Sequence, residues 1–284
     1  MGAGTPGEFK EAVRDQWTHA ADAWRRWHPK FAQMTGAVTT ALCEAAELRP
    51  GQAVLDLAGG TGEPGLTAAQ EVAPGGRVTC TDFVPGMVAT AEANAGDAGI
   101  TNMAFQQVDA EDIPFDDASF DRVISRFGVM FFPNVQQALG EIRRVVKPDG
   151  RVAFAVWQTA DKNAWFSDLN GLLMSKGLVQ PPPPGMPSPF RFGALGSLPA
   201  ELAAAGFKNV SETPHEARME WPGPPEEYMD FIQATFPAWR KGLAEADAAT
   251  REDTLAAMLD IVRSWWNGSS LQWSGFIYIV AATP

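Results

Sequence analysis

The stretch VLDLAGGTGEPG, residues 54–65, places a carboxylate beside a glycine-rich turn. Gly60, Gly62 and Gly65 fit the spacing G-x-G-x-x-G, in which glycines let the backbone approach a ligand closely. Asp56 lies within the apolar run that precedes them, and burying an unpaired carboxylate is costly. The pattern therefore predicts that Asp56 either accepts structural hydrogen bonds from loop amides or faces a cationic ligand.

Glycine turns of this kind also bind the diphosphate of nicotinamide dinucleotides, but the charge of Asp56 opposes a diphosphate. S-adenosylmethionine fits better, because it carries an ammonium, a sulfonium and no phosphate. We therefore expect S-adenosylmethionine as the cofactor. Besides an enzyme that uses this cofactor, two other functions remain open. One is an NAD(P)-dependent oxidoreductase, which the glycines and Asp82 would also suit. The other is a catalytically silent protein that binds S-adenosylmethionine.

Acidic residues also end the next two apolar segments. Asp82, in VTCTDFVPGM, can accept two hydrogen bonds from a ribose diol, and Phe83 and Met87 either flank an adenine or pack in the core. Asp109, in VDAEDIPF, can accept a hydrogen bond from the adenine amine, with the backbone of Ala110 at a ring nitrogen, or it simply caps the loop.

These residues can meet only if strands and helices alternate along the chain, and the hydrophobic pattern predicts that they do. The expected strands are 53–57, 77–81, 103–108, 120–125 and 151–157, and the expected helices between them are 62–72, 85–95 and 136–146. Turns are expected at 74–76 and 147–150. This alternation predicts a parallel sheet whose ligand lies at the carboxyl ends of its strands.

The flanking regions complete this architecture. Residues 1–49 are expected to be helices broken at His28-Pro29 that form a lid, 50–160 the cofactor-binding core, and 161–284 the remainder of the sheet, in the same domain. A helical cap, about 222–268, separates the last two strands, and the proline-rich stretch 180–189 reads as a stiff connector. We expect an α/β fold with a doubly wound, Rossmann-like sheet of seven strands, mostly parallel with the last antiparallel.

Taken together, VLDLAGGTGEPG, TDFVPGM, VDAEDIPF and FDRVISRFGVMFFPNVQQALGEIRRVVKPDGR resemble class I S-adenosylmethionine-dependent methyltransferases, and most of all the ubiquinone/menaquinone C-methyltransferase-like group. The resemblance covers residues 50–157. It implies the methionine moiety near Asp56 and the glycines, the ribose at Asp82 and the adenine at Asp109. The cofactor contacts expected on this basis are Asp56, Ala58, Gly60, Thr61, Gly62, Asp82, Phe83, Met87, Asp109, Ala110, Ser125, Arg126 and Phe127.

Methyl transfer from a sulfonium is an in-line displacement, so alignment and exclusion of water are the enzyme's main tasks. Its products are the methylated acceptor and S-adenosylhomocysteine. Trp17, Trp24 and His28 share one helical face, which forms an aromatic lid or merely packs on the domain; His28 is a candidate base or a helix-end residue. Arg126 is expected to pair with an anionic substrate group, or with Asp109 or Glu111.

The acceptor is expected to be a small apolar or aromatic molecule, methylated on carbon or oxygen, because the regions outside the core are rich in tryptophan and phenylalanine. We expect Trp17, Trp24, His28, Arg126, Met130 and Trp157 to contact it.

The formal net charge of −12 disfavours nucleic acids and anionic membranes as partners. No apolar run approaches the roughly 18 residues of a membrane span, and no secretory signal is recognised. Cys43 and Cys80 read as reduced thiols, and no metal site is expected. These features favour a cytoplasmic monomer or homodimer.

Overall fold

The computed structural model describes residues 6–181 and 187–284. Seven strands form one sheet in the order β3-β2-β1-β4-β5-β7-β6, and β7 runs antiparallel to both of its neighbours. The strands are β1 Ala53–Leu57, β2 Arg77–Asp82, β3 Met103–Gln107, β4 Phe120–Arg126, β5 Val146–Trp157, β6 Lys208–Trp221 and β7 Leu271–Thr283. The predicted α/β architecture, with seven strands and only the last antiparallel, is confirmed.

Helices connect the parallel strands, as the alternating pattern predicts. They are α3 Gly65–Glu71, α4 Pro85–Asp97, α5 Val135–Val145 and α7 Ser197–Ala204. Every residue of β1 is buried, which is typical of a central strand covered on both faces. The order of the strands reverses between β1 and β4, so a crevice is expected at the carboxyl ends of these two strands.

The N-terminal region differs from its prediction. Helix α1, Pro6–Met34, continues through Pro29 instead of breaking there, and α2, Gly36–Ala46, follows it. Proline in a helix interior removes one backbone hydrogen bond. Here the helix is held on both sides of Pro29, because Trp27 and Met34 are buried in the core. Tertiary packing thus outweighs the local preference for a break.

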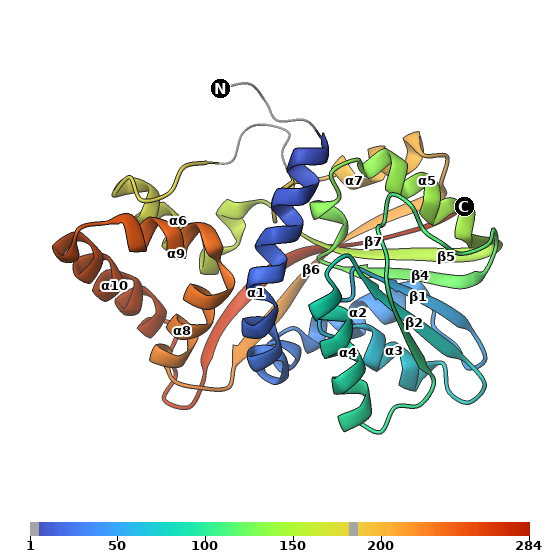
Figure 1. Cartoon of the computed structure of the whole chain (residues 1–284), viewed down its shortest axis with the longest axis horizontal. Helices are drawn as coiled ribbons and strands as arrows, with labels where there is room; N and C mark the ends of the chain where they lie inside the picture. Colours follow the sequence, from blue (N-terminus) through green and yellow to red (C-terminus); the bar gives the residue numbers. More distant parts are fainter. Residues whose placement is uncertain (1–5, 182–186) are drawn as a thin grey trace.

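The cap consists of α8 Pro225–Thr235, α9 Pro237–Glu245 and α10 Ala248–Arg263, where a continuous helical region was expected. A further helix of this region, α6 Ala164–Ser175, was not predicted. The long strands β6 and β7 run from the core to the cap, and α1 lies between core and cap (Figure 1). The expected connector 180–189 lies partly outside the described residues.

One predicted turn is wrong. Residues 147–150 belong to β5, and the register between β4 and β5 shifts between Phe120 and Arg122. The extra residues are therefore accommodated as an irregularity within the ladder. Among the described residues, no helix is long and apolar enough to cross a membrane.

Candidate active site

Asp56 is fully buried near the carboxyl end of β1. Its Oδ2 accepts a hydrogen bond of 2.9 Å from the backbone amide of Gly65. Asp56 therefore does accept a structural hydrogen bond from a loop amide, as one of the two interpretations of the sequence predicts. Its Oδ1 is buried and has no hydrogen-bond partner within the described parts of the chain. Burial raises the pKa of Asp56 to about 8, although the nearby Arg126 guanidinium and the Gly65 amide lower it. The carboxylate thus retains one unused acceptor.

The loop after β1 bends closely around this carboxylate. A Cβ atom at Gly59 would lie 2.5 Å from Oδ2 of Asp56, and one at Gly65 would lie 2.7 Å from it. Ala58 adopts a left-handed backbone with φ of 57°, a conformation that favours glycine. Such strain is often kept at ligand-binding sites.

Asp82 joins this loop to the end of β2. Its Oδ2 accepts a 3.0 Å hydrogen bond from the amide of Gly60, and its Oδ1 accepts one of 2.9 Å from the amide of Val84. Burial raises the pKa of Asp82 to about 6, and these amides oppose the shift. The residue as a whole is half-buried at the edge of the sheet.

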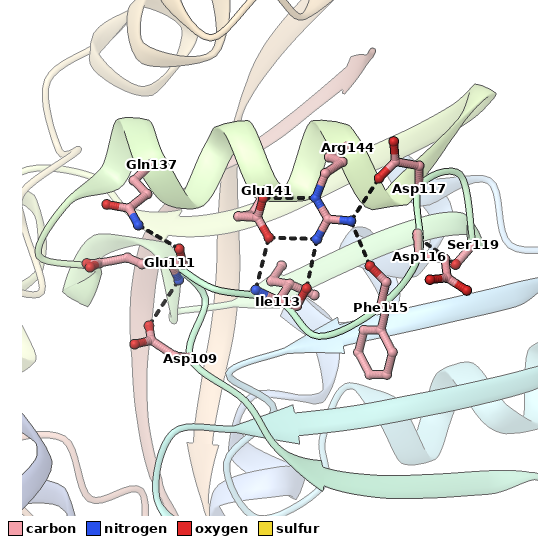
Figure 2. Close-up of polar contacts among 10 residues, drawn as sticks. All are labelled: Asp109, Glu111, Ile113, Phe115, Asp116, Asp117, Ser119, Gln137, Glu141 and Arg144. Atoms are coloured by element: carbon pink, nitrogen blue, oxygen red, sulfur yellow. Dashed lines mark hydrogen bonds and ion pairs between the residues drawn. The ribbon is translucent and has the colours of Figure 1, made fainter.

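The loop after β3 is fixed against α5 by a polar network (Figure 2). Arg144 donates hydrogen bonds of 2.7 Å to the carbonyl oxygens of Ile113 and Phe115, and Glu141 Oε2 accepts one of 3.0 Å from the Ile113 amide. Asp109 caps the start of this loop, because its Oδ1 accepts a 3.0 Å hydrogen bond from the Glu111 amide. The network holds Asp109 and the buried Ala110 at the edge of the sheet.

At the end of β4, Ser125 is fully buried, and no described residue forms a hydrogen bond with its Oγ. The next side chain, Arg126, is also buried and donates hydrogen bonds of 2.7 and 2.6 Å to the hydroxyls of Thr35 and Thr39. Its NH2 group donates a 3.2 Å hydrogen bond to the Glu63 carbonyl oxygen. Burial lowers the pKa of Arg126, and the charges of Glu63 and then Asp56 oppose the shift.

This arrangement corrects one expectation. Arg126 does not pair with Asp109 or Glu111: its guanidinium is buried against Thr35 and Thr39, and both carboxylates bind Lys10 of α1 instead. Within the described residues, no carboxylate forms a salt bridge with Arg126. The hydrogen-bond acceptors of Arg126 are all neutral oxygens, so among the described residues its charge is balanced at longer range, by Glu63 and Asp56.

Known proteins are similar in sequence to the part of the chain that contains these strand ends. Residues 55–154 match the methyltransferase domain family. An uncharacterized protein from Mycobacterium tuberculosis is 40% identical over 116 residues, 41% of each chain. A ubiquinone/menaquinone biosynthesis C-methyltransferase from Ralstonia pickettii is 40% identical over 121 residues, 41% of this chain and 49% of that one. Residues 55–154 therefore match a methyltransferase domain, and this part of the chain is called the methyltransferase domain.

The surroundings of this methyltransferase domain are less closely matched. The chain spans less than half the length of the two curated relatives named above. The solved structure of the YcgJ protein from Bacillus subtilis superposes with a TM-score of 0.56 and 21% identity, covering 87% of this chain and 98% of that one. This similarity extends the shared fold well beyond the methyltransferase domain.

Helix α1 packs against the glycine loop with the face that the sequence singled out. His28 is a buried mid-helix residue, not the helix-end residue considered above, and its Nδ1 lies 2.7 Å from the Thr61 hydroxyl of the glycine loop. Burial, and then the charge of Arg126, lower the pKa of His28 to about 4. Trp17 packs edge-on against Phe131, so the face contacts segments following both β1 and β4.

Trp24 extends the same face of α1 toward the cap. Its ring packs edge-on against Phe231 of α8, with the ring centroids 5.8 Å apart. The indole Nε1 of Trp24 is buried, and none of the residues that the structure describes accepts a hydrogen bond from it. The face of α1 therefore bridges the glycine loop of the methyltransferase domain and the cap.

Phe127, directly after β4, stacks on Trp157, the last residue of the neighbouring β5, with ring centroids 4.4 Å apart and planes 3° apart. Phe127 adopts a left-handed backbone with φ of 62°, which is unusual for a bulky residue. Trp157 in turn packs on Trp165 of α6. The stack forms an apolar wall beside Ser125 and leads into the cap.

Three other residues that were expected to contact the cofactor or the acceptor lie in the core or face α1. Met87 and Met130 are buried in the core, and the half-buried ring of Phe83 faces cationic side chains of α1. The sequence did not single out Lys10, Thr35, Thr39 or Arg144, which hold the site together from distant parts of the chain. Only the charge of Lys10 and Arg144 could have drawn attention to them.

Proposed function

We propose that this protein binds S-adenosylmethionine at the carboxyl ends of β1 and β4 and transfers its methyl group to a small apolar or aromatic acceptor, on carbon or oxygen. The matched domain supports the donor and the reaction. The covering helix α1 and the aromatic cap support the class of acceptor.

The observation that carries the proposal is a set of unmet polar groups at the strand ends. Among residues 6–181 and 187–284, Asp56 Oδ1 and Ser125 Oγ are buried without hydrogen-bond partners, and Arg126 is a buried cation without a bonded carboxylate. The amino-acid end of S-adenosylmethionine carries an ammonium and a carboxylate. The ammonium suits Asp56 and the carboxylate suits Arg126, so the residues present fit this group.

The other end of the cofactor meets groups of equally suitable chemistry. Asp82 would accept hydrogen bonds from the ribose hydroxyls, because its carboxylate lies beside the glycine loop. Asp109 would accept a hydrogen bond from the adenine amine, and Phe83 offers an aromatic face to the adenine ring. A nicotinamide dinucleotide would instead bring a diphosphate close to the buried carboxylate of Asp56. The negative charges of the two groups would repel each other.

The acceptor would lie between the glycine loop and the cap, under α1. The groups that border this region are mainly aromatic: Trp24 from α1, the Phe127–Trp157 stack, and Phe231 from α8. An aromatic lining binds planar or apolar molecules and excludes water. We therefore favour a phenolic, quinol-like or other apolar acceptor.

His28 is the candidate base of this site. Its lowered pKa keeps the imidazole neutral near pH 7, and the Nδ1 contact with Thr61 fixes the ring. If Nδ1 carries the proton and donates to Thr61, Nε2 is free to take a proton from the acceptor. The bound cofactor supplies the electrophilic methyl group. The chain orients the two reactants and excludes water, and His28 receives the proton.

The test begins with isothermal titration calorimetry using S-adenosylhomocysteine and NADH as separate ligands. We expect S-adenosylhomocysteine to bind and NADH not to bind. Binding of NADH alone would establish the oxidoreductase alternative and refute the proposal. Phenolic, quinol and amine acceptors are then incubated with S-adenosylmethionine, and mass spectrometry follows the gain of one methyl group. Cofactor binding without turnover of any acceptor would favour the silent binding protein.

A further inference from the structure

Two cationic side chains of α1 cover the expected adenine end of the site. Lys10 Nζ forms ion pairs with Asp109 Oδ2 and, at 2.9 Å, with Glu111 Oε2. Lys10 Nζ and Arg14 Cζ each lie 5.8 Å from the centroid of the Phe83 ring. The carboxylate and the aromatic face that the proposed function assigns to adenine are therefore both engaged by the chain itself.

The cations match the features of adenine that these groups would recognise. An ammonium satisfies a carboxylate as the exocyclic amine of adenine would, and a cation over a phenylalanine ring occupies the face on which a flat base would stack. Burial lowers the pKa of Lys10, but the hydrogen bonds to Asp109 and Glu111 together with the charges of these carboxylates raise it by more. The pKa of Lys10 therefore lies above its ordinary value. Lys10 is thus charged at neutral pH.

The two halves of α1 are held very differently. The second half is anchored by buried Trp27 and Met34 and by an ion pair between Lys30 and Glu227 of α8. Around Lys10, the pairing side chains remain partly exposed: 27% for Lys10 and 28% for Asp109. Contacts at such exposure change an equilibrium by only a few-fold. The first turns are therefore the more easily displaced end of α1, and displacing them tilts the helix about its anchored second half.

We propose that Lys10 and Arg14 are an intramolecular placeholder for adenine, which must leave Asp109 and Phe83 before the cofactor can bind fully. The inference rests on the proposed function. It assigns to the first turns of α1 a competitive role, in which the ligand-free protein satisfies its own adenine site. Removing the placeholder should strengthen cofactor binding, whereas removing a contact residue would weaken it.

The test compares the wild type with Lys10→Ala, Lys10→Arg and Arg25→Ala by isothermal titration calorimetry. Arg25 is the matched control, because it lies on the same helix with its side chain 67% exposed and pairs only with Asp22 among the described residues. Two ligands are used: S-adenosylhomocysteine, and 5′-methylthioadenosine, which has the adenine and ribose but lacks the amino-acid end.

We expect Lys10→Ala to bind both ligands about threefold more tightly than the wild type, because one surface ion-pair site is removed from the competing state. Lys10→Arg and Arg25→Ala should bind like the wild type. Raising NaCl from about 50 to about 500 mM should tighten binding of S-adenosylhomocysteine to the wild type but not to Lys10→Ala. This ligand has no net charge near pH 7, so screening of the overall protein charge contributes little.

Weaker binding by Lys10→Ala would overturn the inference, because Lys10 would then be a contact of the bound cofactor. Equal affinities for all four proteins would overturn it as well, while leaving the proposed function intact. Failure of S-adenosylhomocysteine to bind any of them would refute the proposed function and the inference together.

Discussion

At the scale of single residues, Asp56 has two oxygens with different surroundings. Oδ2 closes the glycine loop through the Gly65 amide, and Oδ1 has no hydrogen-bond partner among the residues that the structure describes. A single carboxylate can therefore shape the loop and recognise a ligand. Its pKa of about 8 shows how strongly burial disfavours the charge in the absence of a cationic ligand.

Asp56→Asn tests both roles, because asparagine keeps the shape and one acceptor but removes the charge. We expect S-adenosylhomocysteine affinity to fall about tenfold to hundredfold, the range for a charged hydrogen bond. The folded pKa lies above the unfolded value, so the contribution of Asp56 to stability is lost as the pH rises from about 4 through about 8. Asp56→Asn should not show this loss of folding stability at rising pH, because asparagine does not titrate in this range.

Urea unfolding of both ligand-free proteins at pH 6 and pH 9 measures this dependence, and calorimetry measures the affinity. A variant that binds the ligand as tightly as the wild type would show that Oδ1 does not face it.

His28 should act on stability in the opposite direction. Its folded pKa of about 4 lies below the unfolded value, so stability is present above pH 6.5 and lost as the pH falls toward 4. We expect His28→Gln to remove an acid sensitivity of about 1–3 kcal/mol and to lower turnover strongly. Affinity for S-adenosylhomocysteine should change little.

The measurements are urea unfolding between pH 4 and 7 and single-turnover rates with an identified acceptor. Full turnover by His28→Gln, together with a flattened pH dependence of stability, would leave His28 a packing residue only.

At the scale of elements, the glycine loop depends on close contact between its backbone and Asp56. Gly59→Ala would place a Cβ 2.5 Å from Asp56 Oδ2 and 2.7 Å from Cys80 Sγ, so the strand ends must move. We expect a loss of about 1–3 kcal/mol in the free energy of unfolding. Gly96→Ala in α4 is the control, because nothing lies within 4 Å of its added Cβ.

The control should be neutral or stabilise by roughly 0.5–1 kcal/mol, since alanine is the better helix former. Denaturant unfolding of the two variants compares them directly. Equal stabilities would mean that the loop around Gly59 yields easily.

The loop after β3 depends on α5 in a similar way. Arg144→Lys keeps a charge but loses the planar fork that reaches Ile113 and Phe115. We expect faster amide hydrogen exchange at Ile113 and Phe115 and weaker binding of S-adenosylhomocysteine by about threefold to tenfold. Arg143→Lys, at the exposed neighbouring position, is the control and should leave exchange at both amides unchanged.

Much of this element arrangement could be predicted, because strand composition and turn residues are local signals. The break at Pro29 was wrong, since packing on both sides of the proline holds α1 together. The division of the cap and helix α6 were missed, because their boundaries depend on contacts with the rest of the cap.

The candidate site shows the same limit. Asp56, Asp82 and Asp109 stand in recognisable motifs, and the structure brings them to one edge. Lys10 meets Glu111 across 101 residues of sequence, and Arg126 meets Thr35 across 91. Nothing within either short stretch specifies such a partner, because it is set by how the whole chain folds.

At the scale of the whole molecule, a cofactor that binds only the folded state should stabilise it. At 100 times its dissociation constant, S-adenosylhomocysteine should add about 2.7 kcal/mol, corresponding to a rise of roughly 5–10 °C in the melting temperature. NADH at the same concentration should cause no rise. Differential scanning calorimetry measures both, with the buffer and protein concentration held constant.

Because α1 is one uninterrupted helix, it connects the adenine end of the proposed cofactor site mechanically to the cap. Its first turns reach Asp109, and its second half is fastened to the cap through Glu227. A rod of this kind transmits tilt from one end to the other, so admission of the donor and seating of the acceptor cannot be independent events. Steady-state kinetics should accordingly show compulsory-order addition, with the donor first, since its entry is what repositions the rod.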